Sequence, residues 1–174
     1  MFRAALTVHV MAGLTCVVAG VLATTARKRP GRHPTAGTVY LWGIGVVFLT
    51  ATVMAGLRWQ RDRHLFVIAT VAFGAALTGW FARRHRPRRW LLWHAVAMSV
   101  SFIALFTGFY VDNGPRLPVW KLLPPLAFWF LPAAVGVPLL VRALIRNGAV
   151  RSEVVGGGGR ESNPPDRATR SRRF

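Results

Sequence analysis

Long apolar stretches alternate along this sequence with short clusters of cations. An apolar stretch of about 18 residues or more can form a helix that crosses a lipid bilayer, because about 20 residues at a rise of 1.5 Å span its hydrocarbon core of about 30 Å. Five stretches reach this length, at about residues 4–26, 38–57, 64–82, 90–111 and 122–141. The pattern therefore predicts an all-α polytopic membrane protein, a bundle of five transmembrane helices.

The fifth stretch differs from the others because it contains Pro124, Pro125, Pro132 and Pro138. Proline disrupts helices in water, but neighbouring helices of a membrane bundle can satisfy the carbonyl groups that it leaves without a donor. We count this stretch as a membrane span. A count of four would place the arginines that follow it on the side opposite to the other basic loops.

The cations are divided unequally between the two sides of the predicted bundle. One side holds six of the 23 lysines and arginines, and the other side holds seventeen. The side with six comprises Arg3 and the connections near residues 58–63 and 112–121. Short cytoplasmic segments of membrane proteins carry the excess of Lys and Arg. The sequence therefore predicts that the N-terminus lies outside and the C-terminus inside. Since 21 of these cations are arginine, a bias that we attribute to the codon supply of a GC-rich bacterium, we place the protein in a bacterial cytoplasmic (inner) membrane.

Residues 147–174 have a different composition from the rest of the chain. They contain a run of four glycines, two adjacent prolines and several arginines, with no apolar period. We predict a transmembrane domain at residues 1–146 followed by a disordered basic cytoplasmic tail at 147–174. The expected partners are the lipid bilayer, anionic lipid headgroups at the basic loops and tail, and a membrane protein partner. We expect no nucleic-acid partner, since the tail offers no nucleic-acid-binding fold.

The composition narrows the class of protein. Hydrophobic residues make up 53% of the chain and charged residues 16%, whereas about a quarter of a soluble domain is charged. Together with the single cysteine, Cys16, these values exclude a soluble enzyme, a disordered protein and a disulfide scaffold. The sequence contains no P-loop and no HExxH motif, and no charged residue lies deep inside a predicted span, which argues against an ion-coupled transporter.

The histidines are the main candidates for chemistry. His9 and His64 lie near the predicted outer ends of their helices, whereas His33, His85 and His94 lie near the inner ends. Helical spacing places two of them on stripes of small or polar residues, which favour contact with other helices. These stripes are Gly13, Cys16, Gly20 and Thr24 below His9, and Met98, Ser101, Leu105, Gly108 and Asp112 along from His94.

Two interpretations of the histidines are open. Facing histidines hold haem in small helical membrane cytochromes. An outer pair, His9 and His64, and an inner pair, His94 with His33 or His85, would then hold haem b in an electron-transfer protein. Alternatively, the histidines are hydrogen-bonded structural groups that fix the helix register. The sequence favours the structural interpretation.

The connection between the fourth and fifth spans is the most distinctive loop. Asp112-Asn113-Gly114-Pro115 is typical of a tight turn, because glycine can take a positive φ and aspartate can bond its own backbone. Tyr110 and Trp120 flank this turn as interface anchors. We interpret the loop as a rigid external hairpin. The alternative is a lid over a pocket beneath it, with Asp112 as its acid.

Two parts of the chain resemble a known family. His33-Pro34-Thr35-Ala36-Gly37-Thr38-Val39-Tyr40 is similar to a His-x-x-x-Gly-x-x-Tyr motif at the start of a helix. The stretch from His94 to Leu144 resembles the hallmark segment of the family called domain of unknown function 2306. The resemblance is carried by residues 109–115, 117–120, Leu123-Pro124, Phe128-Trp129 and Arg142-Ala143-Leu144. The resemblance covers about residues 5–145. It implies a multi-helix bacterial inner-membrane protein and no established catalytic residues.

Three classes of function are compatible with this sequence. The first is a non-enzymatic integral membrane protein, either a membrane subunit or a small-molecule binder. The second is a b-type haem or quinone electron-transfer protein that uses the intramembrane histidines. The third is a small transporter. The sequence favours the first class.

Overall fold

The computed structural model describes residues 1–26, 31–118 and 120–146 of the chain. These residues form five α-helices and two short 3-10 turns and contain no strand: α1 (Phe2–Thr25), α2 (Arg32–Leu57), α3 (Trp59–His85), α4 (Trp90–Asn113), η1 (Gly114–Arg116), η2 (Trp120–Leu122) and α5 (Pro125–Arg146). Each of the five α-helices is long and apolar enough to span a membrane. The predicted all-α chain with five such helices is confirmed. The tail predicted at 147–174 lies outside the described residues.

The helices extend beyond the apolar stretches that predicted them. α2 begins at Arg32 and α3 at Trp59, several residues before the apolar positions begin. A helix continues as long as its backbone hydrogen bonds continue, and polar side chains at its ends are no obstacle outside the hydrocarbon core. α5 begins later than predicted, at Pro125, because proline suits the first turn, where no N–H donor is needed. It then runs unbroken through Pro132 and Pro138.

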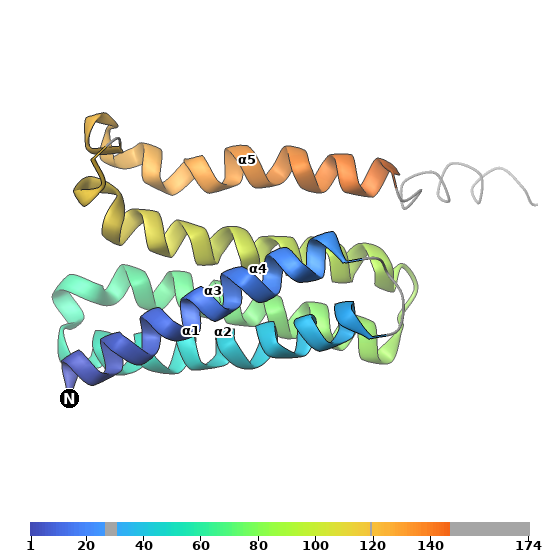
Figure 1. Cartoon of the computed structure of the whole chain (residues 1–174), viewed down its shortest axis with the longest axis horizontal. Helices are drawn as coiled ribbons and strands as arrows, with labels where there is room; N and C mark the ends of the chain where they lie inside the picture. The colour runs from blue at the N-terminus through green and yellow to red at the C-terminus, as the bar shows by residue number, and fades with distance from the viewer. Residues whose placement is uncertain (27–30, 119, 147–174) are drawn as a thin grey trace, which may run out of the picture.

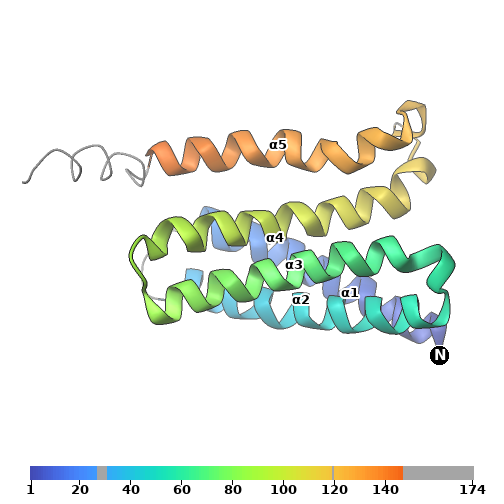
Figure 2. The same cartoon turned by 180° about the vertical axis from the view of Figure 1, so that it is seen from behind.

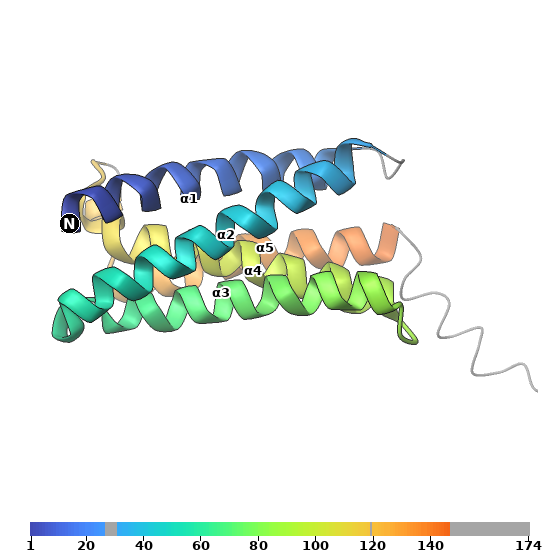
Figure 3. The ribbon, with the colours of Figure 1, turned by 90° about the horizontal axis from the view of Figure 1, so that it is seen from below.

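Four of the helices form a bundle, and the fifth lies on its side. α1 and α3 lie on opposite sides of the bundle, with α2 and α4 between them (Figure 3). α5 lies along α4 on the outside of the bundle (Figures 1 and 2), and its Trp129 ring also approaches His64 of α3. Only Phe128 and Pro132 of α5 are buried. The core is therefore built by α1–α4.

The bundle has two distinct ends. The N-terminus, the turn between α2 and α3 and the connection from α4 to α5 lie at one end, which we call the N-terminal end (Figure 1). The start of α2, the turn between α3 and α4 and the last residues of α5 lie at the other, the C-terminal end. This arrangement places the two predicted groups of loops at opposite ends of the bundle.

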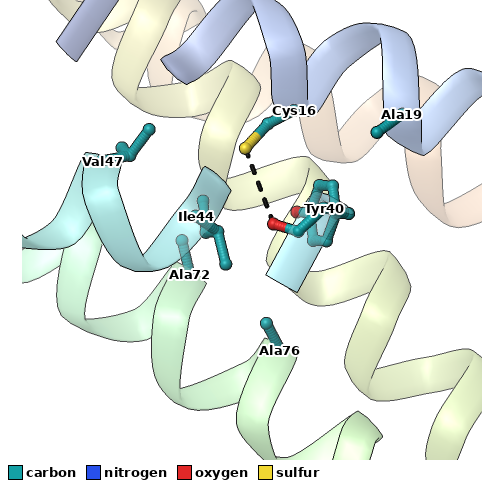
Figure 4. Packing of buried hydrophobic residues seen from close by; sticks show 7 residues of the cluster. All are labelled: Cys16, Ala19, Tyr40, Ile44, Val47, Ala72 and Ala76. Atoms are coloured by element: carbon teal, nitrogen blue, oxygen red, sulfur yellow. Dashed lines mark hydrogen bonds between the residues drawn. The ribbon is translucent and has the colours of Figure 1, made fainter. Parts of the chain in front are cut away.

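The core is made mainly of small side chains. Its buried cluster takes residues from three helices: Cys16 and Ala19 of α1, Tyr40, Ile44 and Val47 of α2, and Ala72 and Ala76 of α3 (Figure 4). The Cys16 thiol donates a hydrogen bond to the backbone oxygen of Tyr40 at 3.7 Å. A Cβ atom on Gly43 would lie 2.6 Å from the Cys16 sulfur. Close approach of α1 and α2 therefore requires glycine here, as is common between membrane helices.

Most of the stripe predicted below His9 faces the bundle. Cys16 and Gly20 are buried, and His9 and Gly13 are half-buried. Thr24 is exposed, which corrects the prediction for that position. Fifteen residues at 3.6 per turn rotate Thr24 about 60° away from His9. Its hydroxyl donates to the backbone oxygen of Val21 at 2.9 Å, so it needs no partner from another helix.

Candidate functional site

A cavity of about 250 Å³ opens at the N-terminal end of the bundle, between α1, α2, α3 and α4. The residues along its inner wall are mostly apolar, namely Leu6, Val47, Ala51, Met54, Leu65, Ile68, Ala69, Ala72, Ala104, Leu105 and Gly108. The residues around its rim are mostly charged, namely Phe2, Arg58, Arg61, Asp62, Asp112 and Arg116. His9 is a polar residue of the inner wall. The cavity thus has an apolar interior and a charged mouth.

The cavity reaches deep into the bundle. Its lining on α2 extends from Arg58 to Val47, which corresponds to about 16 Å at 1.5 Å per residue. Val47 and Ala72 line its inner limit and also belong to the buried core cluster. The core therefore closes the cavity on the side of the C-terminal end.

Both acidic residues of the helical part of the chain lie at this rim. Asp62 and Asp112 are the only carboxylates in residues 1–146, and both line the cavity. Asp62 lies in the first turn of α3, where the positive end of the helix dipole favours an acid. Asp112 lies in the last turn of α4, where the dipole disfavours one. Neither carboxylate forms a hydrogen bond or an ion pair with a described residue.

The three rim arginines are held to different degrees. The Arg58 guanidinium carbon lies 3.9 Å from the centre of the Phe2 ring, in a cation–π contact. Arg116 Nη1 donates to the backbone oxygen of Asp112 at 2.9 Å. Arg61 makes no such contact with the part of the chain that the structure describes. The rim therefore carries three cations and two anions that are not paired with one another.

His9 is held in the cavity wall by α2. Its Nδ1 lies 2.9 Å from the hydroxyl oxygen of Thr50. That hydroxyl has one hydrogen, which it donates to a backbone carbonyl, with Val46 at 2.8 Å. The hydroxyl oxygen therefore accepts the hydrogen bond from His9 Nδ1–H. In the neutral imidazole, Nε2 then carries the lone pair.

The loop after α4 packs against the first turns of α5. The rings of Tyr110 and Trp120 lie 5.3 Å apart, and Asn113 Nδ2 donates to the backbone oxygen of Phe109 at 3.0 Å. Gly114 has a φ of −49°, so this turn does not use the positive φ that glycine permits. Glycine is required here because the Phe128 ring packs against this position. A Cβ atom at residue 114 would lie 2.5 Å from that ring, which is too close. Asp112 and Arg116 of this connection line the cavity, and the role of the loop as a lid stays a prediction.

At the opposite end of the bundle, two histidines join all four core helices. His33 of α2 donates from Nδ1 to the backbone oxygen of Ala23 in α1, and His94 of α4 donates from Nδ1 to that of Gly79 in α3, each at 2.8 Å. The two ring centres lie 6.4 Å apart with an interplanar angle of 77°. Of the two inner pairs that the sequence left open, the structure brings together His33 and His94. His85 is exposed and stacks on Phe81.

The predicted outer pair is not formed. His9 contacts Thr50 of α2 and lines the cavity, whereas the His64 ring lies 6.4 Å from the ring of Trp129 in α5. The two side chains therefore face different helices. Among the described residues, no group of three or more His, Cys, Asp or Glu side chains could hold a metal ion.

Asp62 and the arginines beside it were not predicted from the sequence as site residues. A signal for them existed, because Asp62 and Asp112 are the only acidic residues before residue 147. Their rarity in a strongly basic chain pointed to both positions. Their meeting at one cavity depends on how α3 and α4 are oriented in the bundle, which the sequence pattern did not predict.

A comparison of the chain with protein-family models, with curated proteins and with solved structures finds no match. The resemblance to the family called domain of unknown function 2306 therefore stays a prediction.

Proposed function

We propose that this chain is a multi-pass protein of a bacterial cytoplasmic membrane that binds a small molecule in the cavity at the N-terminal end. In this proposal the N-terminal end faces the outside and the arginine-rich C-terminal end faces the cytoplasm. The protein is then a non-enzymatic binder, and its ligand enters from the outer side.

The membrane part of the proposal is supported by the surface of the helices. Large apolar side chains are exposed along the bundle, among them Leu14, Val18, Leu49, Phe81, Phe130 and Leu139. Hydrocarbon is the medium that such a surface suits. The orientation is supported by the charges, since among the described residues eight lysines and arginines lie at the C-terminal end and six at the N-terminal end.

At the C-terminal end, we propose that arginines contact anionic lipid headgroups. Arg84 lies over the ring of Trp80 at 5.6 Å and Arg86 over that of Trp90 at 5.3 Å. Tryptophan is typical of the headgroup level of a membrane. Each cation near an anionic surface contributes about 1 kcal/mol to membrane binding.

The binding part of the proposal depends on one observation. Both carboxylates of residues 1–146, three guanidiniums and His9 converge on a cavity whose inner wall is apolar. A concave apolar site with a few polar groups is the usual form of a small-molecule site. The cavity is larger than one of about 150 Å³ that holds benzene. A molecule somewhat larger than benzene therefore fits.

Cysteine labelling tests the cavity and its orientation together. Ala69 lines the cavity, whereas Ala76, two turns along the same helix, is buried in the core. A small membrane-impermeant thiol reagent added outside intact cells should modify Ala69→Cys and leave Ala76→Cys unmodified. The native Cys16 is fully buried and gives a low background. Equal labelling of the two variants, or labelling of Ala69→Cys only from the cytoplasmic side, would contradict the proposal.

A second candidate is haem-dependent electron transfer at the C-terminal end, favoured by the contact between His33 and His94. Two metal–imidazole bonds of about 2 Å each, with the half-widths of both rings, separate the ring centres by about 6 Å, close to the 6.4 Å observed. Histidines that bind metals usually donate their other N–H to a carbonyl, as both do here. Bound haem would supply one-electron redox chemistry.

A reduced-minus-oxidised absorption spectrum of the purified protein tests this second candidate. A b-type band that His94→Ala removes and His64→Ala retains would support it. The absence of a band from the wild-type protein would reject it, and the cavity proposal would be unaffected.

A further inference from the structure

We infer that the ligand of the cavity is a zwitterion with a compact apolar body. Its ammonium group would lie at the carboxylates of the rim, its anionic group at the guanidiniums, and its body against the inner wall. This inference rests on the proposed function, and it adds the chemical class of the ligand.

The charges at the rim argue for a ligand of both signs. Three guanidiniums and two carboxylates surround the mouth, and no described pair of them forms an ion pair. A purely anionic ligand would meet two carboxylates of its own sign, and a purely cationic ligand would meet three guanidiniums. A zwitterion can place its ammonium group at the carboxylates and its anionic group at the guanidiniums. Each of its charges then lies beside groups of opposite sign.

Asp112 is the better candidate for the ammonium group. The Asp62 carboxylate has a structural reason for its position, since it lies at the N-terminal end of α3. Asp112 lies at the C-terminal end of α4, where the negative end of the helix dipole disfavours an acid. Among the described residues its carboxylate forms no hydrogen bond or ion pair, and it interacts electrostatically with His9, which lines the same cavity. A cationic group of the ligand would give this carboxylate a direct ion pair.

Arg61 is the better candidate for the anionic group. Arg58 is held by the Phe2 ring and Arg116 by the backbone of Asp112. Arg61 has neither kind of contact and lines the cavity. Its neighbour Arg63 lies in the same turns of α3 and does not line the cavity, which makes Arg63 the matched control.

The size of the cavity sets the size of the apolar body. A volume of about 250 Å³ lies between the roughly 150 Å³ that holds benzene and the roughly 300 Å³ at which drug-sized sites begin. The inner wall offers alanine, valine, leucine, isoleucine and methionine side chains and no charge. A branched body of about four to six carbons satisfies both limits.

Four probes with nearly the same branched body separate the charge classes. Leucine is the zwitterion, isocaproate the anion, isoamylamine the cation and isoamyl alcohol the neutral compound. Each is titrated by calorimetry into the full chain in lipid nanodiscs. We expect leucine to bind up to about fivefold more tightly than isocaproate or isoamylamine, each of which lacks one partly exposed charge pair, and more tightly still than isoamyl alcohol, which lacks both.

Charge variants assign the two groups of the ligand. Asp112→Asn should weaken leucine and isoamylamine about fivefold and leave isocaproate unchanged or improved. Arg61→Gln should weaken leucine and isocaproate to a similar extent and leave isoamylamine unchanged, while Arg63→Gln should change none of them. Loss of leucine binding in Arg63→Gln as well as Arg61→Gln would overturn the assignment.

A cavity-filling variant locates the binding. Gly108 lines the cavity, whereas Gly74 is exposed on α3 and a Cβ atom there meets nothing within 4 Å. Gly108→Leu should abolish leucine binding, and Gly74→Leu should retain it. If both variants bind leucine like the wild type, the binding is elsewhere and the inference is wrong.

The outcomes distinguish the inference from the proposed function. If isocaproate or isoamylamine binds as tightly as leucine and Gly108→Leu abolishes that binding, the cavity is a binding site and the zwitterion inference is overturned. If none of the four probes binds, the inference is also overturned, and the labelling of Ala69→Cys decides the proposed function by itself.

Discussion

The two ends of the four-helix core differ in whether their polar side chains form hydrogen bonds within the protein. At the C-terminal end, His33 and His94 each donate to a backbone carbonyl of a neighbouring helix and so tie four helices together. At the N-terminal end, the side chains of Asp62, Asp112 and Arg61 line a cavity and form no hydrogen bond or ion pair with the described residues, although Asp112 interacts electrostatically with His9. A polar group that forms a hydrogen bond within the bundle is explained by its contribution to the fold. A polar group that lines a cavity without such a bond needs an explanation other than the fold, such as contact with a ligand. The difference supports the proposal that the ligand binds at the N-terminal end.

The largest expected effect compares the packing of the two halves of α3. Ala76→Leu should destabilise the protein by about 1–3 kcal/mol, because the side chain is fully buried in the core and has no space to expand. Ala69→Leu should cost clearly less, since its side chain would extend into the cavity. Thermal unfolding of both variants in detergent measures the difference. Equal destabilisation would show that the cavity is not available space.

The histidines offer a second comparison. His33→Ala should destabilise the protein by about 1–2 kcal/mol, because it removes a hydrogen bond between α1 and α2 and leaves the packing around the ring incomplete. His64→Ala removes a ring contact with Trp129 in α5 and should cost less than His33→Ala. A larger loss in His64→Ala, measured in the same unfolding assay, would contradict the structural role assigned to the C-terminal end.

The two tyrosines of the chain provide a matched pair. The Tyr40 hydroxyl lies 2.8 Å from the hydroxyl of Ser101 in the buried interior, so Tyr40→Phe should cost about 1 kcal/mol. Tyr110 contacts Trp120 through its ring, which phenylalanine retains. Tyr110→Phe should therefore leave the unfolding temperature nearly unchanged. Similar shifts of the unfolding temperature in both variants would show that the hydrogen bond between Tyr40 and Ser101 contributes little to stability.

The smallest expected effect concerns the two carboxylates. Asp62→Asn should lower the free energy of unfolding by a few tenths of a kcal/mol, because it removes an acid from the N-terminal turn of α3. Asp112→Asn should leave it unchanged or raise it by a similar amount, since α4 disfavours an acid at its C-terminal end. A marked loss of stability in Asp112→Asn would mean that this carboxylate has a structural partner.

The sequence predicted the five helices because each apolar stretch is long and free of charge, and length alone distinguishes such a stretch from a soluble helix. It predicted the helix ends less well, since α3 continues through Arg61, Asp62 and Arg63 on backbone hydrogen bonds that composition does not reveal. The loop after α4 was recognised as a turn, but the role of Gly114 depends on the Phe128 ring from a helix later in the chain.

The candidate site was predicted only in part. Spacing along one helix identified the faces of His9 and Asp112, and both line the cavity. It could not tell which neighbouring helix each face meets, so His9 was paired with His64, which contacts α5 instead. Asp62 was missed because it lies outside the apolar stretch of its helix.

The prolines of α5 have a mechanical consequence for the rim. Because proline carries no N–H, the carbonyl groups of Phe128 and Ala134 lack their usual helical donors at Pro132 and Pro138. Pro132 and Pro138 are therefore the positions at which α5 can bend most easily. The Phe128 ring also packs against Gly114, and Gly114 lies two positions before Arg116 in the sequence. A bend of α5 at Pro132 would therefore move the Phe128 ring against Gly114, and so would reach the mouth of the cavity beside Arg116.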